Sequence, residues 1–129
     1  MRYLLTCIFS LTLSLVAGCA LAPSDASGLM DVAERPAEKA LLAGLRAYDD
    51  AQYPQAEQLL GQSLKSGLAS KRDQAAAHKH LAFIYCTSSR TAECEAAFRA
   101  ARAADPKFTL SRSEAGHPLW GPVYQRVQQ

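Results

Sequence analysis

Cysteines and histidines are the residues of this chain whose types and spacing could do chemistry. Cys86 and Cys94 lie on either side of a turn expected at residues 88–91. On two antiparallel helices joined by that turn, both thiols would stand at the same height. They could therefore form a disulfide, remain two buried thiols, or bind a metal together with His78 and His80.

The spacing of the histidines argues against the metal site. His78 and His80 are two residues apart, so they point to different faces of a helix. This spacing is not that of a zinc motif. We therefore expect no metal, and we expect His117, which precedes Pro118, to be a hydrogen-bonded structural residue.

The amino terminus has the pattern of an export signal. Arg2 precedes a short apolar run, residues 4–16, which is too short for a convincing membrane span. The run ends in LVAGC at residues 15–19, which resembles a bacterial lipobox. Cleavage would leave Cys19 as the first residue, carrying diacylglycerol and palmitate. More than one acyl chain makes a durable anchor.

The residue after this cysteine predicts where the protein lies in the cell envelope. Ala20, and not an aspartate, follows Cys19, and by resemblance to enterobacterial sorting rules this indicates the periplasmic face of the outer membrane. The periplasm is oxidising, which favours the disulfide between Cys86 and Cys94. The alternative is an ordinary secretory signal in which Cys19 is incidental.

Composition predicts an all-α domain. Residues 19–129 hold 23 alanines but only seven β-branched residues, and alanine favours helices whereas β-branched residues favour strands. The chain has 14 basic and 12 acidic residues, and removal of Arg2 leaves 13 against 12, a net charge of +1. That charge gives no strong field to attract nucleic acid.

Three segments divide the chain. Residues 1–18 form the signal peptide, residues 19–34 form a flexible tether with proline, serine and glycine, and residues 35–129 form a helical domain. Helices are expected from Pro36, from Pro54 to near Gly67, from about Lys71, and from a cap at Thr91 to Asp105-Pro106. Ser111 and Glu114 have capping-box spacing, and a final amphipathic helix places Trp120 and Tyr124 as a cap on the domain.

The first four helices form two hairpins that share a tetratricopeptide-like frame. Gly44 and Ala82 are equivalent and lie 38 residues apart, against the usual period of 34, and the excess fits a longer connection at residues 67–72. The small and large positions of the frame are Gly44, Tyr53, Ala56, Leu60 and Leu64, then Ala82, Tyr85, Cys94, Phe98, Ala101 and Pro106. The alternative is a plain four-helix bundle.

Two strings make the chain similar to a known family. HKHLAFIYC at residues 78–86 and EAGHPLWGPV at residues 114–123, together with the lipobox and the hairpins, resemble small lipoproteins associated with type VI secretion, the TssQ family. The resemblance implies an accessory envelope lipoprotein without known catalytic residues. The alternative is a lipoprotein that serves pilus or outer-membrane assembly.

We expect a binding protein and not an enzyme. The chain shows no nucleophile–base constellation, no glycine-rich phosphate loop and no paired-carboxylate motif, and no cofactor is expected. The first helix of each hairpin would line a concave groove for an envelope protein, and we expect that protein to be a secretion-system component. The repeat frame places five residues in that groove: Leu41, Leu45, Tyr48, Lys79 and Phe83. A second possibility is that the carboxyl-terminal helix fills the groove and makes these residues core.

Overall fold

The computed structural model describes residues 34–129, and these residues form helices and no strand. The all-α prediction is therefore confirmed. The signal peptide 1–18, the lipidation site Cys19 and the tether, apart from Glu34, lie outside the described residues. The helices are α2 (Pro36–Asp49), α3 (Tyr53–Lys65), α4 (Lys71–Thr87), α5 (Thr91–Ala104), α6 (Arg112–Ala115) and α7 (Gly121–Gln128).

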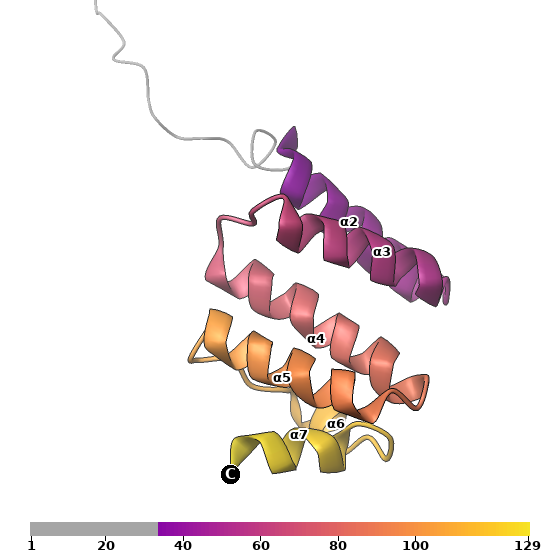
Figure 1. The fold of residues 1–129 in the computed structure, drawn as a ribbon, viewed down its shortest axis with the longest axis vertical. Coiled ribbons are helices and arrows are strands. Elements are labelled where there is room, and N and C mark those ends of the chain that lie inside the picture. Colours follow the sequence, from indigo (N-terminus) through magenta and orange to yellow (C-terminus); the bar gives the residue numbers. More distant parts are fainter. Residues whose placement is uncertain (1–33) are drawn as a thin grey trace, which may run out of the picture.

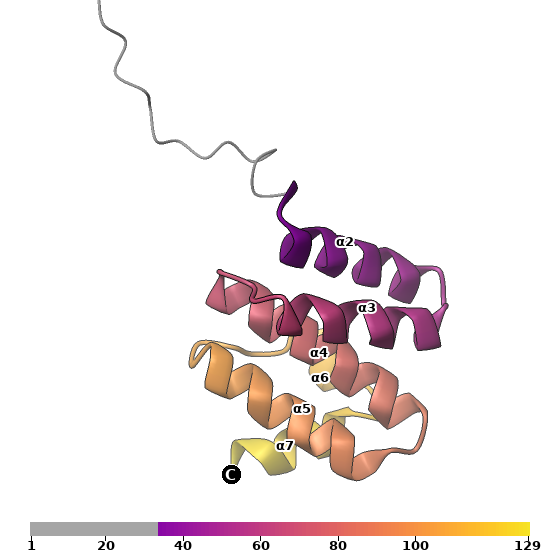
Figure 2. The ribbon, with the colours of Figure 1, turned by 45° about the horizontal axis from the view of Figure 1, so that its top comes forward.

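Two antiparallel hairpins, α2–α3 and α4–α5, make up most of the fold. Figure 1 shows these helices following one another along the long axis of the molecule, with α7 at the end opposite α2. The turned view in Figure 2 shows α2 and α3 beside each other above α4 and α5. Helix α3 contacts α4, and α7 contacts α5, so each layer covers the one before it.

The helices begin at the predicted proline and capping residues, with one exception. Pro36 and Pro54 lie in the first turns of α2 and α3, and the Ser111–Glu114 capping box is present at α6. The prediction that Thr91 caps α5 is wrong. The cap position belongs to Arg90, and Thr91 lies one residue inside the helix because the preceding turn ends at Arg90.

The two hairpin turns repeat each other at the offset of 38 residues. Ala51 and Ser89 both have left-handed backbone, with φ of 58° and 60°. The amide of the residue after each donates to a carbonyl five residues back, Gln52 to Ala47 at 2.8 Å and Arg90 to Tyr85 at 2.8 Å. This is the Schellman pattern that satisfies helix-end carbonyls. The two turns therefore share one backbone conformation at this offset.

A disulfide links the two helices of the second hairpin, and an arginine in the same turn links this hairpin to the first. Cys86 and Cys94 form a disulfide across the α4–α5 turn, with Cα atoms 5.2 Å apart, as predicted. In the same turn, Arg90 donates two hydrogen bonds of 2.9 and 3.0 Å to the Glu57 carboxylate on α3. Its guanidinium also pairs with Glu93 and lies 4.3 Å from the centre of the Tyr85 ring. Arg90 thus connects the two hairpins.

The C-terminal segment covers the last apolar face, as expected of Trp120 and Tyr124. Both side chains are buried, and the Tyr124 hydroxyl accepts a 3.1 Å hydrogen bond from the Leu110 amide. The Trp120 indole N–H donates to the Glu114 carbonyl at 2.8 Å. Within residues 34–129, no helix combines the length and apolar character that crossing a membrane requires.

Candidate functional site: an aromatic row across the hairpins

Six rings form a continuous row that joins the first hairpin to the C-terminal segment. The row runs through Tyr53, Tyr48, His80, Phe83, Trp120 and His117. Successive ring centroids are 5.6, 5.1, 5.9, 4.3 and 3.4 Å apart in that order. Four elements contribute, because Tyr48 comes from α2, Tyr53 from α3, His80 and Phe83 from α4, and the last two from the segment around α6 and α7.

Exposure varies along the row, from the exposed Tyr53 to the buried Phe83 and Trp120, and His117 beyond them is half-buried. Tyr53 is 40% exposed, and Tyr48 and His80 are half-buried. Phe83 is only 3% exposed because Trp120 stacks on it with 26° between the ring planes. The most accessible rings, Tyr53, Tyr48 and His80, therefore adjoin one another at the first-hairpin end. We call the side chains of Leu45, Tyr48, Tyr53 and His80 the aromatic surface.

An ion pair lies beside the buried part of the row. Lys79 Nζ lies 2.7 Å from Glu114 Oε1 and 5.7 Å from the centre of the Phe83 ring. Burial raises the pKa of the Glu114 carboxyl, but hydrogen bonds from Lys79 and Ser111 outweigh it, and the pKa falls below its usual range. The carboxylate stays charged, and the pair fastens the α6 segment onto α4.

The structure divides the five predicted groove residues. Leu41 is 6% exposed and belongs to the core, and Phe83 lies beneath Trp120, so the placement of these two at an open groove is corrected. Leu45 and Tyr48 are half-buried and keep accessible surface. The Lys79 ammonium is engaged by Glu114. The C-terminal segment thus covers Phe83 and engages Lys79, whereas Leu45 and Tyr48 remain partly accessible.

His80 is held in one orientation at the centre of the row. Its Nδ1 lies 2.7 Å from the Ala76 carbonyl, an arrangement in which Nδ1 carries the proton and donates. Burial lowers the pKa of His80 below its ordinary value, more than the bond to Ala76 raises it. The ring is therefore neutral at pH 7. Burial likewise raises the pKa of the Tyr48 hydroxyl, which keeps the surface uncharged.

The remaining histidines do not join it in a metal site. His78 lies in a different hollow, beside Leu81 and Tyr85, as its spacing from His80 predicts. His117 stacks on Trp120 with 3° between the planes, and its Nδ1 accepts a hydrogen bond from the Leu119 amide at 3.2 Å. Among residues 34–129 there is no group of three His, Cys, Asp or Glu side chains that could hold a metal ion.

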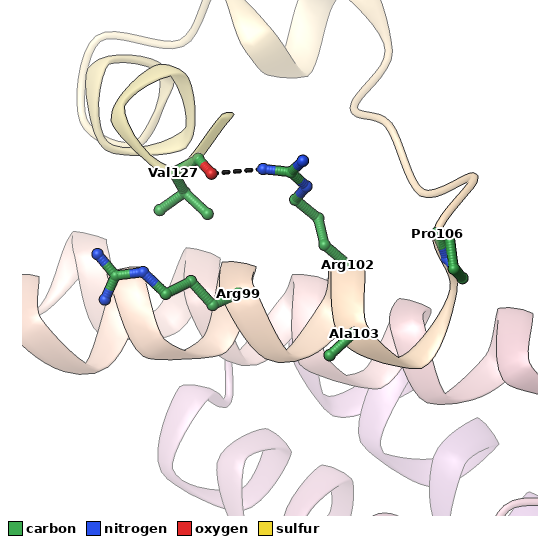
Figure 3. A pocket seen from close by; sticks show the side chains of 5 residues that line it. All are labelled: Arg99, Arg102, Ala103, Pro106 and Val127. Carbon is green, nitrogen blue, oxygen red and sulfur yellow. Dashed lines mark hydrogen bonds between the residues drawn. The ribbon is translucent and has the colours of Figure 1, made fainter. Parts of the chain in front are cut away.

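A second hollow lies between α5 and α7 and has a structural role. Figure 3 shows Arg99 and Arg102 rising from α5 towards α7, with the Arg102 guanidinium bonded to the Val127 carbonyl. The hollow has a volume of about 320 Å³, and its other lining residues are Ala103 and Pro106. Because the last carbonyls of a helix have no partners within it, Arg102 satisfies the end of α7.

Tyr53 and His80 were not predicted as surface residues. Helix α2 ends at Asp49, and α3 begins at Tyr53 after a short turn. This short connection could have predicted that Tyr53 lies beside Tyr48. His80 precedes Phe83 by three residues and lies close to the same face of α4. The covering of Phe83 depends on where the C-terminal segment folds back, which local spacing does not encode.

Fold and site together describe a protein of paired helical hairpins with an aromatic surface and a capping C-terminal segment. In comparisons with known proteins, the chain matches no protein-family model, no curated protein and no solved structure.

Proposed function

We propose that this chain is a non-enzymatic, lipid-anchored adaptor of the bacterial envelope, with tetratricopeptide-like hairpins that bind a protein partner. The partner is a component of a type VI secretion system, and the protein sits on the periplasmic face of the outer membrane through lipid on Cys19. The secretion link rests on the two strings at residues 78–86 and 114–123 and on the lipobox.

The aromatic surface is the observation that carries the binding proposal. Tyr53 is among the large hydrophobic side chains that are exposed, and it contacts the half-buried Tyr48. Aromatic side chains are enriched at the energetic centres of protein interfaces. His80, in its fixed orientation, and the buried Phe83 both contact the Tyr48 ring, which lowers the cost of ordering that ring on binding.

Cross-linking from Tyr53 tests this function in the native envelope. A photo-crosslinking amino acid at position 53 should capture a secretion-system component, identified by mass spectrometry. The matched control is position 58, because Gln58 is also exposed on α3 but lies about 140° around the helix axis. Capture of no secretion component from position 53, or equal capture from position 58, contradicts the proposal. The absence of type VI sheath and baseplate genes nearby would contradict the secretion link.

A further inference from the structure

A small pocket opens on α4 beyond the Lys79–Glu114 pair. Its volume is about 270 Å³, just below the range of about 300–1,000 Å³ that drug-sized ligands occupy. One wall is the first half of α4, and the other is the segment that follows α5. The lining residues are Arg72, Ala75, Ala76, Lys79, Asp105, Lys107, Phe108 and Thr109.

The charges of this pocket leave one positive charge without compensation. Arg72, Lys79 and Lys107 contribute three positive charges, and Asp105 and the Glu114 carboxylate bound to Lys79 contribute two negative ones, which leaves +1. Among residues 34–129, neither the Arg72 guanidinium nor the Lys107 ammonium has an ion-pair partner. Two cations are thus available to one anion.

The floor of the pocket is apolar. Ala75 is buried, and Ala76 and Phe108 are half-buried. The Phe108 ring is fixed by an edge contact with Tyr124, at 6.2 Å between centroids. An anion that also carries an apolar side chain therefore fits the pocket better than a bare ion.

We propose that this pocket binds one carboxylate of the partner protein, either a chain-terminal carboxylate or an Asp or Glu side chain. This rests on the proposed function, because the ligand is the segment that lies on the aromatic surface. A singly charged carboxylate matches the net charge of +1, whereas a doubly charged phosphate exceeds it. The planar guanidinium of Arg72 can bind both carboxylate oxygens.

The pocket and the aromatic surface adjoin on α4. Arg72, Ala76 and Lys79 follow at spacings of four and three residues, which places them on one helix face, and His80 lies beside it. Eight residues separate Arg72 from His80, a rise of about 12 Å along the helix. An extended chain covers that distance in about three to four residues. The partner should therefore carry its carboxylate three to four residues from an apolar anchor.

Peptide titration of the isotopically labelled full-length lipoprotein in detergent tests the pocket. The probes are acetyl-Trp-Ala-Ala-Ala with a free carboxylate, the same peptide as its amide, and acetyl-Trp-Ala-Ala-Glu-amide. We expect at least one carboxylate probe to shift the amide signals of Ala76 and Phe108. The amide probe should bind about tenfold more weakly, because it loses the charge-assisted hydrogen bonds to Arg72 and Lys107. Whichever carboxylate probe binds more tightly identifies the source of the group.

Matched substitutions on the two walls of the pocket locate the effect. Arg72→Gln and Lys107→Gln should each weaken carboxylate binding about tenfold. Lys71→Gln is the control, because Lys71 is an exposed cation next to Arg72 but does not line the pocket. Equal weakening by all three variants means that only the overall charge attracts the peptide, and this overturns the proposal.

Other outcomes separate the pocket from the proposed function. Equal binding of the carboxylate and amide probes overturns the pocket inference even if Tyr53 captures a secretion component. Specific carboxylate binding with no such capture upholds the pocket while the secretion proposal fails. If none of the peptides binds but phosphatidylglycerol vesicles do, and Lys107→Gln weakens that binding, the pocket is a lipid-headgroup site and the inference is wrong.

Discussion

The Trp120 ring lies on the Phe83 ring, with centroids 4.3 Å apart. This stack joins residues 37 positions apart in the sequence and decides which part of the α4 face is open. On one side of it, Trp120 and Glu114 cover Phe83 and engage Lys79. On the other side, Tyr48 and His80 keep accessible surface. The C-terminal segment is thus both a cap on the core and the border of the aromatic surface.

Removing the covering ring should cost much of the stability. Trp120→Ala empties a buried aromatic site and also deletes the bond from the indole N–H to the Glu114 carbonyl. We expect the free energy of unfolding to fall by about 3–5 kcal/mol, measured by urea denaturation. Leu119→Ala is the control, because Leu119 is next to Trp120 in the sequence but its side chain is 53% exposed. This variant should change the free energy of unfolding by about 0.5 kcal/mol or less. Similar small effects of both variants would mean that the cover is only loosely attached.

The disulfide should stabilise the domain without being essential for its fold. The two cysteines are eight residues apart, and closing so short a loop in the unfolded chain contributes about 2–3 kcal/mol. The double variant Cys86→Ala/Cys94→Ala should lose that amount and keep its helical circular dichroism. Reductant should lower the wild type to the level of the variant and leave the variant unchanged. Two free thiols in denatured, non-reduced wild-type protein would exclude the bond.

Local patterns predicted the elements well because the deciding interactions are local. Pro36 and Pro54 mark helix starts, and the Ser111–Glu114 box closes within three residues. The cysteine pair was predictable for the same reason, since one short turn fixes both positions.

Long-range pairs were not predictable in this way. The Lys79–Glu114 pair spans 35 residues, and the Arg90–Glu57 pair spans 33. Both depend on how separate elements pack, and neither residue type nor spacing singles out the partner. The same reason explains why Phe83 was expected in an open groove, whereas Tyr48, whose neighbour Tyr53 follows a tight turn, kept its place at the surface.

Acidification should destabilise the protein through His80 before its carboxylates titrate. Burial holds the pKa of His80 below the ordinary value of 6.5, so the folded state binds a proton less readily than the unfolded chain. The contribution of His80 to the free energy of unfolding is therefore complete above pH 6.5 and decreases as the pH falls below 6.5. His78, whose pKa is lowered by burial as well, adds to the effect.

The pH dependence can be assigned with one variant and one titration. Between pH 7 and pH 5, above the usual glutamate range near 4.3, the stability of His80→Gln should fall less than that of the wild type. NMR titration of the His80 ring should give a midpoint below 6.5. Identical pH profiles for variant and wild type would show that His80 is not the group responsible.

Two glycines of the first hairpin should respond in opposite directions to the same substitution. A Cβ on Gly44 would lie 2.9 Å from Leu60 Cγ and 3.1 Å from the Leu60 backbone nitrogen, so α2 and α3 would have to move apart. Overpacking of this kind costs about 1–3 kcal/mol, which exceeds the gain of about 0.8–1 kcal/mol in helix propensity. Gly44→Ala should therefore lower the unfolding midpoint in urea.

Gly61 supplies the matched control, because it lies within α3 and a Cβ there would meet nothing within 4 Å. Gly61→Ala should raise the free energy of unfolding by up to about 1 kcal/mol, since only the propensity gain applies. If Gly44→Ala is also stabilising, the helices can separate at little cost. In that case the close approach of Gly44 to Leu60 does not hold the hairpin in place.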